Sequence, residues 1–188
     1  FTQEDYRRPN GQIYHTYPSL KDKEDQDALW EGITGNGAIS TISTDGICTP
    51  LAAKVRGDRI DNTTGGNVGV EPRLGVMYTE IVARRKHPLE RFVEVTSANP
   101  ARIMGLYPRK GAIAVGSDAD IAILDPSVKG KLRNEDLHES DYSPWEGYDV
   151  AAWPVMTILR GKIMVENGRF LGEARDGKRI ARKLSAAI

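Results

Sequence analysis

Asp45 has the clearest chemical potential in this sequence. It follows residues 38–44, in which apolar and polar side chains alternate, and it precedes Gly46. The alternation predicts a β-strand over residues 38–45 that breaks at the glycine. Because α/β barrels place reactive groups just past the ends of their strands, Asp45 is a candidate catalytic residue. An Asp-Gly pair is also a common way to leave a strand by a turn, and the local sequence alone favours that role.

The segments around Asp45 predict the elements that must position it. Apolar residues at helical spacing predict a helix over residues 24–33, which the glycines at 35–37 end. Residues 46–69 form a long polar connection that closes with several glycines. They carry neither a phosphate-binding loop motif nor a dinucleotide fingerprint, so we expect a loop whose backbone contacts a small ligand.

The rest of the chain predicts helices followed by strands, and therefore an α/β fold. Apolar residues recur at helical spacing over residues 70–82 and 89–96, and Asn99 is the predicted N-cap of a third helix. Residues 110–117 are expected to form a tight turn, and residues 118–126 a strand. Strands are also predicted at 155–160 and 162–166, followed by a hairpin turn at Asn167-Gly168.

Composition narrows the classes of function. Lys plus Arg and Asp plus Glu number 26 each, so the chain lacks the charge excess of a nucleic-acid or membrane-surface protein. No apolar run approaches the ~20 residues that span a bilayer. Cys48 is the single cysteine, which excludes an internal disulfide and a cysteine-based zinc site. We expect a cytoplasmic protein that binds neither nucleic acid nor membrane.

The start of the chain and two of its histidines give further expectations. Phe1 and the polar residues after it do not resemble a natural beginning, so the sequence is expected to be a segment of a longer polypeptide. His15 has no metal-ligand partner at useful spacing, and it is expected at the surface or in hydrogen-bonded packing. No role is expected for His138.

Several blocks of sequence carry a family resemblance. Residues 96–111, TSANPARIMGLYPRKG, resemble a block of the cyclic amidohydrolases, and the similarity continues through residues 113–120 and Asp125-Pro126. Residues 141–147, DYSPWEG, and the Arg-Gly-Lys at 160–162 narrow the resemblance to the hydantoinase and dihydropyrimidinase branch. The similarity extends over nearly the whole chain.

The resemblance implies a TIM-like barrel flanked by a β-sandwich. Residues 1–108 would be the C-terminal part of the barrel, and residues 109–188 would supply sandwich strands and a C-terminal tail. Enzymes of this family open a ring amide with two divalent metal ions, usually zinc, and assemble as homo-oligomers, commonly tetramers. Their ligands are a His-x-His pair, a carboxylated lysine, two further histidines and one aspartate.

The resemblance also assigns site residues. Asp45 matches the aspartate, the one ligand within this sequence, where it could take a proton from the attacking water and deliver it to the leaving nitrogen. Tyr17 and Gly65 match positions whose main-chain groups hold the substrate amide. Hydantoinases commonly carry serine and asparagine there, so both positions depart from the family pattern. The expected substrate is a hydantoin or dihydropyrimidine ring. Gly46 replaces a frequent histidine that is not normally a ligand.

Three hypotheses follow. In the first, the chain is part of a metal-dependent cyclic amidase and is inactive alone, because it supplies one of six protein ligands. In the second, the departures at Tyr17 and Gly65 mark a non-catalytic assembly or interaction protein with the same fold. In the third, the chain is a β-rich assembly module, associating through unpaired strand edges. A His-x-His motif upstream would favour the first hypothesis over the second.

Overall fold

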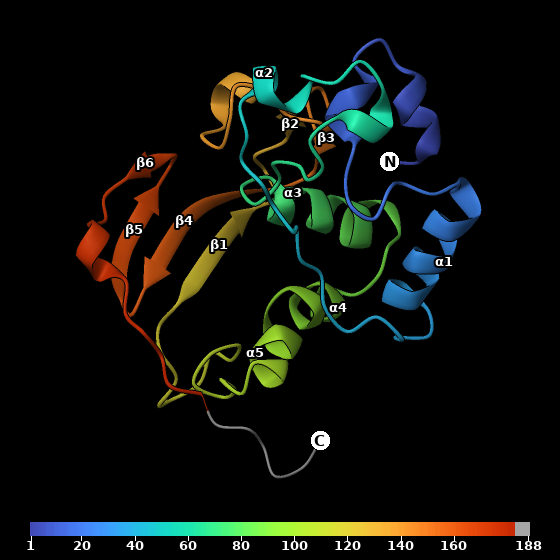
Figure 1. Ribbon diagram of the computed structural model, residues 1–188. Coiled ribbons are helices and arrows are strands. Elements are labelled where there is room, and N and C mark those ends of the chain that lie inside the picture. Colours follow the sequence, from blue (N-terminus) through green and yellow to red (C-terminus); the bar gives the residue numbers. More distant parts are fainter. Residues whose placement is uncertain (183–188) are drawn as a thin grey trace. The chain divides into compact units, whose positions relative to one another are not determined.

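The computed structural model describes residues 1–182 and contains two compact units (Figure 1). The first unit consists of residues 1–39, 43–76 and 130–150. Within the described chain, the second unit consists of residues 40–42, 77–129 and 151–182. Each unit is therefore assembled from segments far apart in the sequence.

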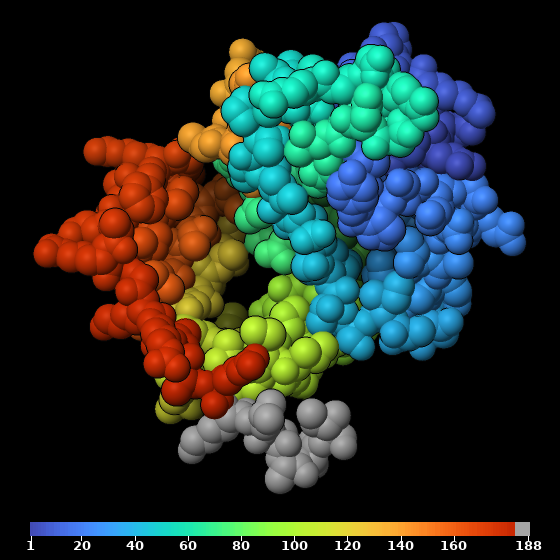
Figure 2. All heavy atoms as spheres, in the orientation of Figure 1, coloured from blue at the N-terminus to red at the C-terminus, as the bar shows by residue number. Residues whose placement is uncertain are grey.

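The first unit packs short elements around a small aromatic and aliphatic core. Its core residues are Ile13, Tyr14, Val68 and Tyr142, which come from three separate segments. In the space-filling view, the cyan and green residues 50–66 lie against the blue N-terminal segment (Figure 2). The elements are η1 (Gln3–Arg7), η2 (Gly11–Tyr14), α1 (Lys23–Thr34), α2 (Leu51–Lys54), η3 (Ile60–Asn62), the start of α3 (Arg73–Tyr78), β2 (Gly130–Lys131), η6 (Asn134–Asp136) and β3 (Asp149–Val150).

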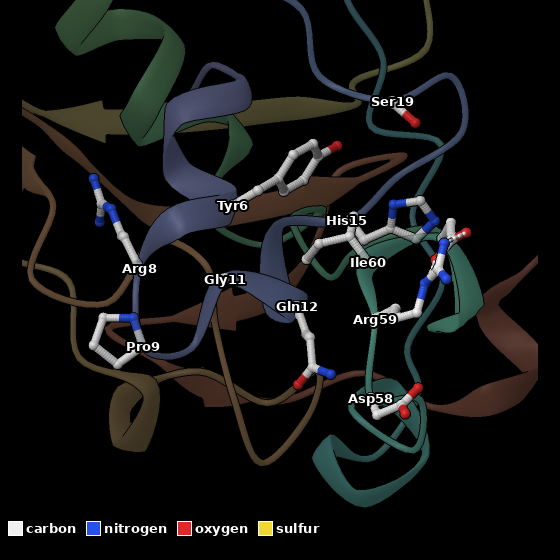
Figure 3. A pocket seen from close by; sticks show the side chains of 11 residues that line it. Tyr6, Arg8, Pro9, Gly11, Gln12, His15, Ser19, Asp58, Arg59 and Ile60 are labelled. Atoms are coloured by element: carbon white, nitrogen blue, oxygen red, sulfur yellow. Dashed lines mark hydrogen bonds and ion pairs between the residues drawn. The ribbon is translucent and has the colours of Figure 1, made fainter.

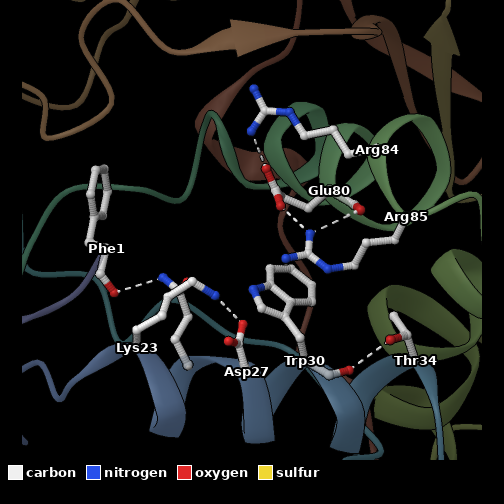
Figure 4. A network of polar contacts seen from close by, with 9 residues as sticks. Phe1, Lys23, Asp27, Trp30, Thr34, Glu80, Arg84 and Arg85 are labelled. Carbon is white, nitrogen blue, oxygen red and sulfur yellow. Dashed lines mark hydrogen bonds and ion pairs between the residues drawn. The ribbon is translucent and has the colours of Figure 1, made fainter.

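Helix α1 confirms the helix predicted over residues 24–33. The Asp22 side chain accepts a hydrogen bond from the backbone N–H three residues on (3.1 Å), which satisfies one of the free donors of the first turn. At the other end, the Thr34 hydroxyl donates to the Trp30 carbonyl (2.8 Å) before the chain leaves the helix at Gly35 (Figure 4). Both ends are thus set by local sequence.

The second unit joins consecutive helical segments to a sheet. Its helical part buries Ile81, Phe92 and Val95. Glu80 forms ion pairs with both Arg84 and Arg85 (Figure 4). The elements are η4 (Thr79–Arg84), α4 (Leu89–Val93), η5 (Glu94–Ala98), α5 (Asn99–Ile103), β1 (Ile121–Asp125), β4 (Trp153–Leu159), β5 (Lys162–Glu166), β6 (Arg169–Phe170) and η7 (Ala174–Asp176).

The sheet of the second unit confirms the strands predicted in the last third of the chain. Its order is β1-β4-β5-β6, and every neighbouring pair is antiparallel. Asn167 and Gly168 connect β5 and β6 with φ values of 48° and 77°. Two successive positive φ angles are what a two-residue hairpin turn requires, and Asn-Gly adopts them readily.

The strand predicted over residues 38–45 is wrong. Ile39 N–H donates to the Gly32 carbonyl (2.9 Å), and Ile42 N–H donates to the Val95 carbonyl (3.1 Å), so the partners of this segment are helical residues. A strand needs a neighbouring strand to share its hydrogen bonds, and none pairs with this segment in the part of the chain that the structure describes.

Asn99 is not an N-cap, which corrects a second prediction. Its backbone is helical (φ −69°, ψ −44°), because the preceding segment η5 leads directly into α5. Its side-chain amide instead donates to the Ser40 carbonyl (3.1 Å). Asn99 thus fixes the segment before Asp45 to a helix.

The remaining expectations about organisation concern the whole chain. Helices and strands both occur, as the predicted α/β class requires. No helix within residues 1–182 is long and apolar enough to cross a membrane. The domain boundary after residue 108 stays a prediction, and the last residues of the expected tail, 183–188, lie outside the described chain.

Candidate functional site

Asp45 presents a free carboxylate. It is exposed, and its backbone is left-handed with φ 46°, a conformation that Asp tolerates better than most residues. Within residues 1–182, its side chain takes part in no hydrogen bond or ion pair. An unpaired, accessible carboxylate can accept a proton or bind a cation, as the sequence predicted for this residue.

The chain just after Asp45 is attached to the glycine-rich loop, residues 62–69. Ile47 N–H donates to the Asn67 carbonyl of this loop (3.0 Å). The Ile47 side chain lies against Gly66, where an added Cβ would come within 2.7 Å of Ile47 Cδ1. Gly66 also has φ +84°, so a side chain there would be disfavoured on two grounds. The glycine-rich loop therefore holds the turn that carries Asp45.

Tyr17 and Gly65, the two predicted substrate-contact positions, lie directly against each other. A Cβ at Gly65 would stand 2.1 Å from both Cδ2 and Cε2 of Tyr17, so the ring occupies the space of any side chain at residue 65. Tyr17 is 64% exposed, and the His15 ring packs on it edge to face with centroids 4.9 Å apart. The two departures from the family pattern are therefore sterically linked, and residue 65 contributes main chain alone.

Lys54 is a fully buried cation. The sequence indicated only that it lies in the long polar connection over residues 46–69. It ends helix α2 with 0% exposure. Its ammonium donates to the carbonyls of His15 (2.5 Å), Thr64 (2.9 Å) and Gly66 (2.7 Å). Burial lowers its pKa to about 8. No periodicity or motif could have revealed this role, because the three acceptors are distant in sequence.

A pocket of about 520 Å³ opens beside His15 (Figure 3). His15 is 2% exposed, and neither ring nitrogen has a hydrogen-bond partner within residues 1–182, so the expected surface or hydrogen-bonded position is wrong. Burial, and then the charge of Lys54, lower the His15 pKa. Asp45, Tyr17 and Gly65 do not line this pocket. Its wall includes Tyr6, Gln12, Ser19, Asp58, Arg59 and Asp61.

Residues 138–141 brace the loops around the candidate site, another role that the sequence did not indicate. The Glu71 carboxylate accepts from His138 N–H (2.7 Å) and lies 2.9 Å from His138 Nδ1. The Asp141 carboxylate accepts from Leu51 N–H at the start of α2 (2.7 Å). These contacts join segments separated by 67 and 90 residues, beyond the reach of local patterns.

The described residues do not form a metal centre by themselves. Within residues 1–182, no group of three or more histidine, cysteine, aspartate or glutamate side chains could hold a metal ion. Protein sites for zinc need three or four such ligands. A complete zinc site would therefore need ligands from outside the described residues.

Sequence comparisons give a consistent result. A model of the amidohydrolase family matches residues 16–164. A D-phenylhydantoinase of Escherichia coli O1:K1 / APEC is 38% identical over 181 residues, which is 95% of this chain and 39% of that protein. The D-phenylhydantoinase of E. coli strain K12 / DH10B is 37% identical over the same length.

Solved hydantoinase structures also resemble this chain. A D-hydantoinase structure superposes with a TM-score of 0.92 at 37% identity, covering 98% of this chain and 41% of that one. An L-hydantoinase (dihydropyrimidinase) from Arthrobacter aurescens gives 0.83 at 36% identity, covering 92% and 38%. The chain thus spans about two fifths of the length of the relatives that it matches.

Proposed function

Because the chain belongs to the amidohydrolase family, we propose that it forms part of an enzyme that hydrolyses a cyclic amide, a hydantoin or a dihydropyrimidine. The observation that carries this proposal is the similarity to hydantoinases in both sequence and structure over at least nine tenths of the chain. In this proposal, residues 1–108 complete a TIM-like barrel, and residues 109–188 contribute sandwich strands and a tail. Assembly as a homo-oligomer, a tetramer in the family, stays a prediction.

Asp45 is this chain's proposed contribution to the chemistry. Members of the family are metal-dependent, and two zinc ions are proposed here, held mainly by residues outside the described chain. The Asp45 carboxylate would provide one ligand and would also hold the proton that the attacking water gives up. Passing that proton to the ring nitrogen lets this nitrogen leave as the C–N bond breaks, which opens the ring. The free and exposed carboxylate supports this role.

Tyr17 and Gly65 are proposed to set the shape of the substrate site. Their main-chain groups would hold the ring amide, while the Tyr17 ring fills the space that an asparagine at residue 65 would occupy. An aromatic face thus replaces two small polar side chains. The linked change supports an altered substrate preference, and it weakens the inference that these departures mark a non-catalytic protein.

A double-mutant cycle tests the link between the two residues. Gly65→Ala alone is expected to displace the Tyr17 ring and to raise the KM for the cyclic substrate. In a Tyr17→Ser background, the same alanine should have little effect, because the ring that it collides with is gone. The expected coupling is roughly 0.5–3 kcal/mol, typical of residues in contact. Additive effects on KM would show that the two positions act independently.

Ring opening tests the proposed activity. A polypeptide that contains this chain together with the histidine and lysine ligands should open hydantoin or dihydrouracil when loaded with zinc. The 188-residue chain alone should not, since its described residues lack a ligand cluster. Two equivalents of zinc bound by the chain alone, with turnover of dihydrouracil, would contradict the proposed division of ligands. Absence of turnover in the ligand-complete polypeptide would favour an interaction protein.

A further inference from the structure

Lys54 connects two loops that are distant in sequence. One acceptor, the His15 carbonyl, belongs to the Tyr17 loop, residues 14–18. The other two, the carbonyls of Thr64 and Gly66, flank Gly65 in the glycine-rich loop. An ammonium has three N–H donors, and here each has one carbonyl acceptor. The side chain is therefore fully occupied in holding these loops together.

The backbone beneath Lys54 is itself fixed. Helix α2 begins where Leu51 N–H donates to the Asp141 carboxylate (2.7 Å). Near its other end, the Ala53 carbonyl accepts from the Thr64 hydroxyl (3.0 Å), a second contact with the glycine-rich loop. The ammonium thus projects from an anchored helix, and its position determines where the three carbonyls converge.

Filling space in the core does not require a lysine. Burying an ammonium is costly unless hydrogen bonds compensate, and an apolar residue of the same length would fill the volume without that cost. An apolar residue would, however, leave two buried carbonyls, of His15 and Gly66, and the partly buried carbonyl of Thr64 without this donor. The convergence of main-chain acceptors from both loops on one cation is what the lysine specifically provides.

We propose that Lys54 is a positioning residue, which holds the Tyr17 loop and the glycine-rich loop at a fixed separation through three main-chain carbonyls. The proposal rests on the proposed function in one respect, that these loops contact the substrate. Lys54 touches neither Asp45 nor the Tyr17 side chain in any described contact, so its effect passes through the backbone. Each acceptor lies one or two residues from a proposed substrate-contact position.

Hydrogen–deuterium exchange of the full 188-residue chain tests whether Lys54 holds the two loops together. In Lys54→Met, the two loops should exchange at least about tenfold faster, because unsatisfied buried carbonyls destabilise the closed arrangement. Helix α1 and strands β2 and β3 should keep their wild-type rates. The matched control, Lys129→Met, removes an exposed lysine and should change neither loop. Unchanged loops, or a uniform increase throughout the unit, would overturn the proposal.

Chemical rescue separates positioning from a general loss of packing. Lys54→Ala removes the equivalent of a propylammonium group, so added propylammonium should restore slow exchange in both loops. Addition of 1-propanol, of similar size but with a single donor and no charge, should not. Equal rescue by both compounds, or rescue by neither, would contradict the proposal. These exchange measurements need no enzymatic turnover. The role of Lys54 can therefore be tested even if the chain does not contribute to cyclic amide hydrolysis.

Discussion

Asp45→Asn is expected to lower the rate of cyclic amide hydrolysis by about a thousandfold or more in a polypeptide with a complete ligand set. Asparagine keeps the size of the side chain but cannot accept the proton in transit, and general acid–base groups commonly contribute factors of 10² to 10⁴. Loss of an anionic ligand adds to the effect. The carboxylate has no partner within residues 1–182, so folding should be unaffected. The loss should appear in kcat with hydantoin or dihydrouracil.

A matched control keeps this result specific. Asp149→Asn removes an exposed carboxylate of the same unit. Within residues 1–182 this carboxylate pairs with the equally exposed Lys131, an ion pair of small energetic value. It should leave kcat and the zinc content unchanged. If Asp45→Asn also retained kcat within a few-fold of the wild type, Asp45 would not be the proton acceptor, and its role would reduce to that of a turn residue.

Raising the pH from 8 to 10 is expected to increase the free energy of unfolding through Lys54. Its pKa is about 8 when buried, against 10.5 in an exposed lysine. Between these values the unfolded chain binds more protons than the folded chain, so stability rises with pH, by at most ~1.4 kcal/mol per unit. Below pH 8 both states are protonated, and the penalty of the buried charge is constant.

Comparison of variants isolates this contribution from other titrating groups. His15, whose carbonyl accepts a hydrogen bond from Lys54, has a lowered pKa and titrates below this range. The raised pKa of Tyr142 acts above it. Denaturant unfolding at pH 7, 8, 9 and 10 should show the rise in wild type and not in Lys54→Met. A parallel pH dependence in both proteins would mean that Lys54 is not the group responsible.

Local sequence predicted the elements whose determinants are local. Helix α1 was predicted from apolar residues at helical spacing and the glycines at 35–37. The β5–β6 hairpin was predicted from Asn167-Gly168, which readily adopts the backbone angles of a two-residue turn. The strand at 38–45 failed for the opposite reason. Alternating apolar and polar residues are typical of a segment that has strands beside it. Residues 38–45 instead form their described backbone hydrogen bonds with helical residues.

The candidate site also combines features that the sequence predicted with features that it could not predict. Asp45, Tyr17 and Gly65 were located by resemblance to a family, and their roles stay predictions. What the sequence could not indicate is how they are held. The collision that excludes a side chain at Gly65 arises from Tyr17, which is distant in the sequence. The three acceptors of Lys54 likewise lie 39, 10 and 12 residues from it, without a common pattern.

The most direct test of the role proposed for Asp45 is to locate the metal ions. Anomalous diffraction at the zinc edge, on crystals of a zinc-loaded polypeptide that contains this chain and the remaining ligands, would place them. We expect an Asp45 carboxylate oxygen at about 2.0–2.2 Å from one of two zinc ions, the usual zinc–carboxylate distance. A two-metal site from which the Asp45 side chain points away would contradict it.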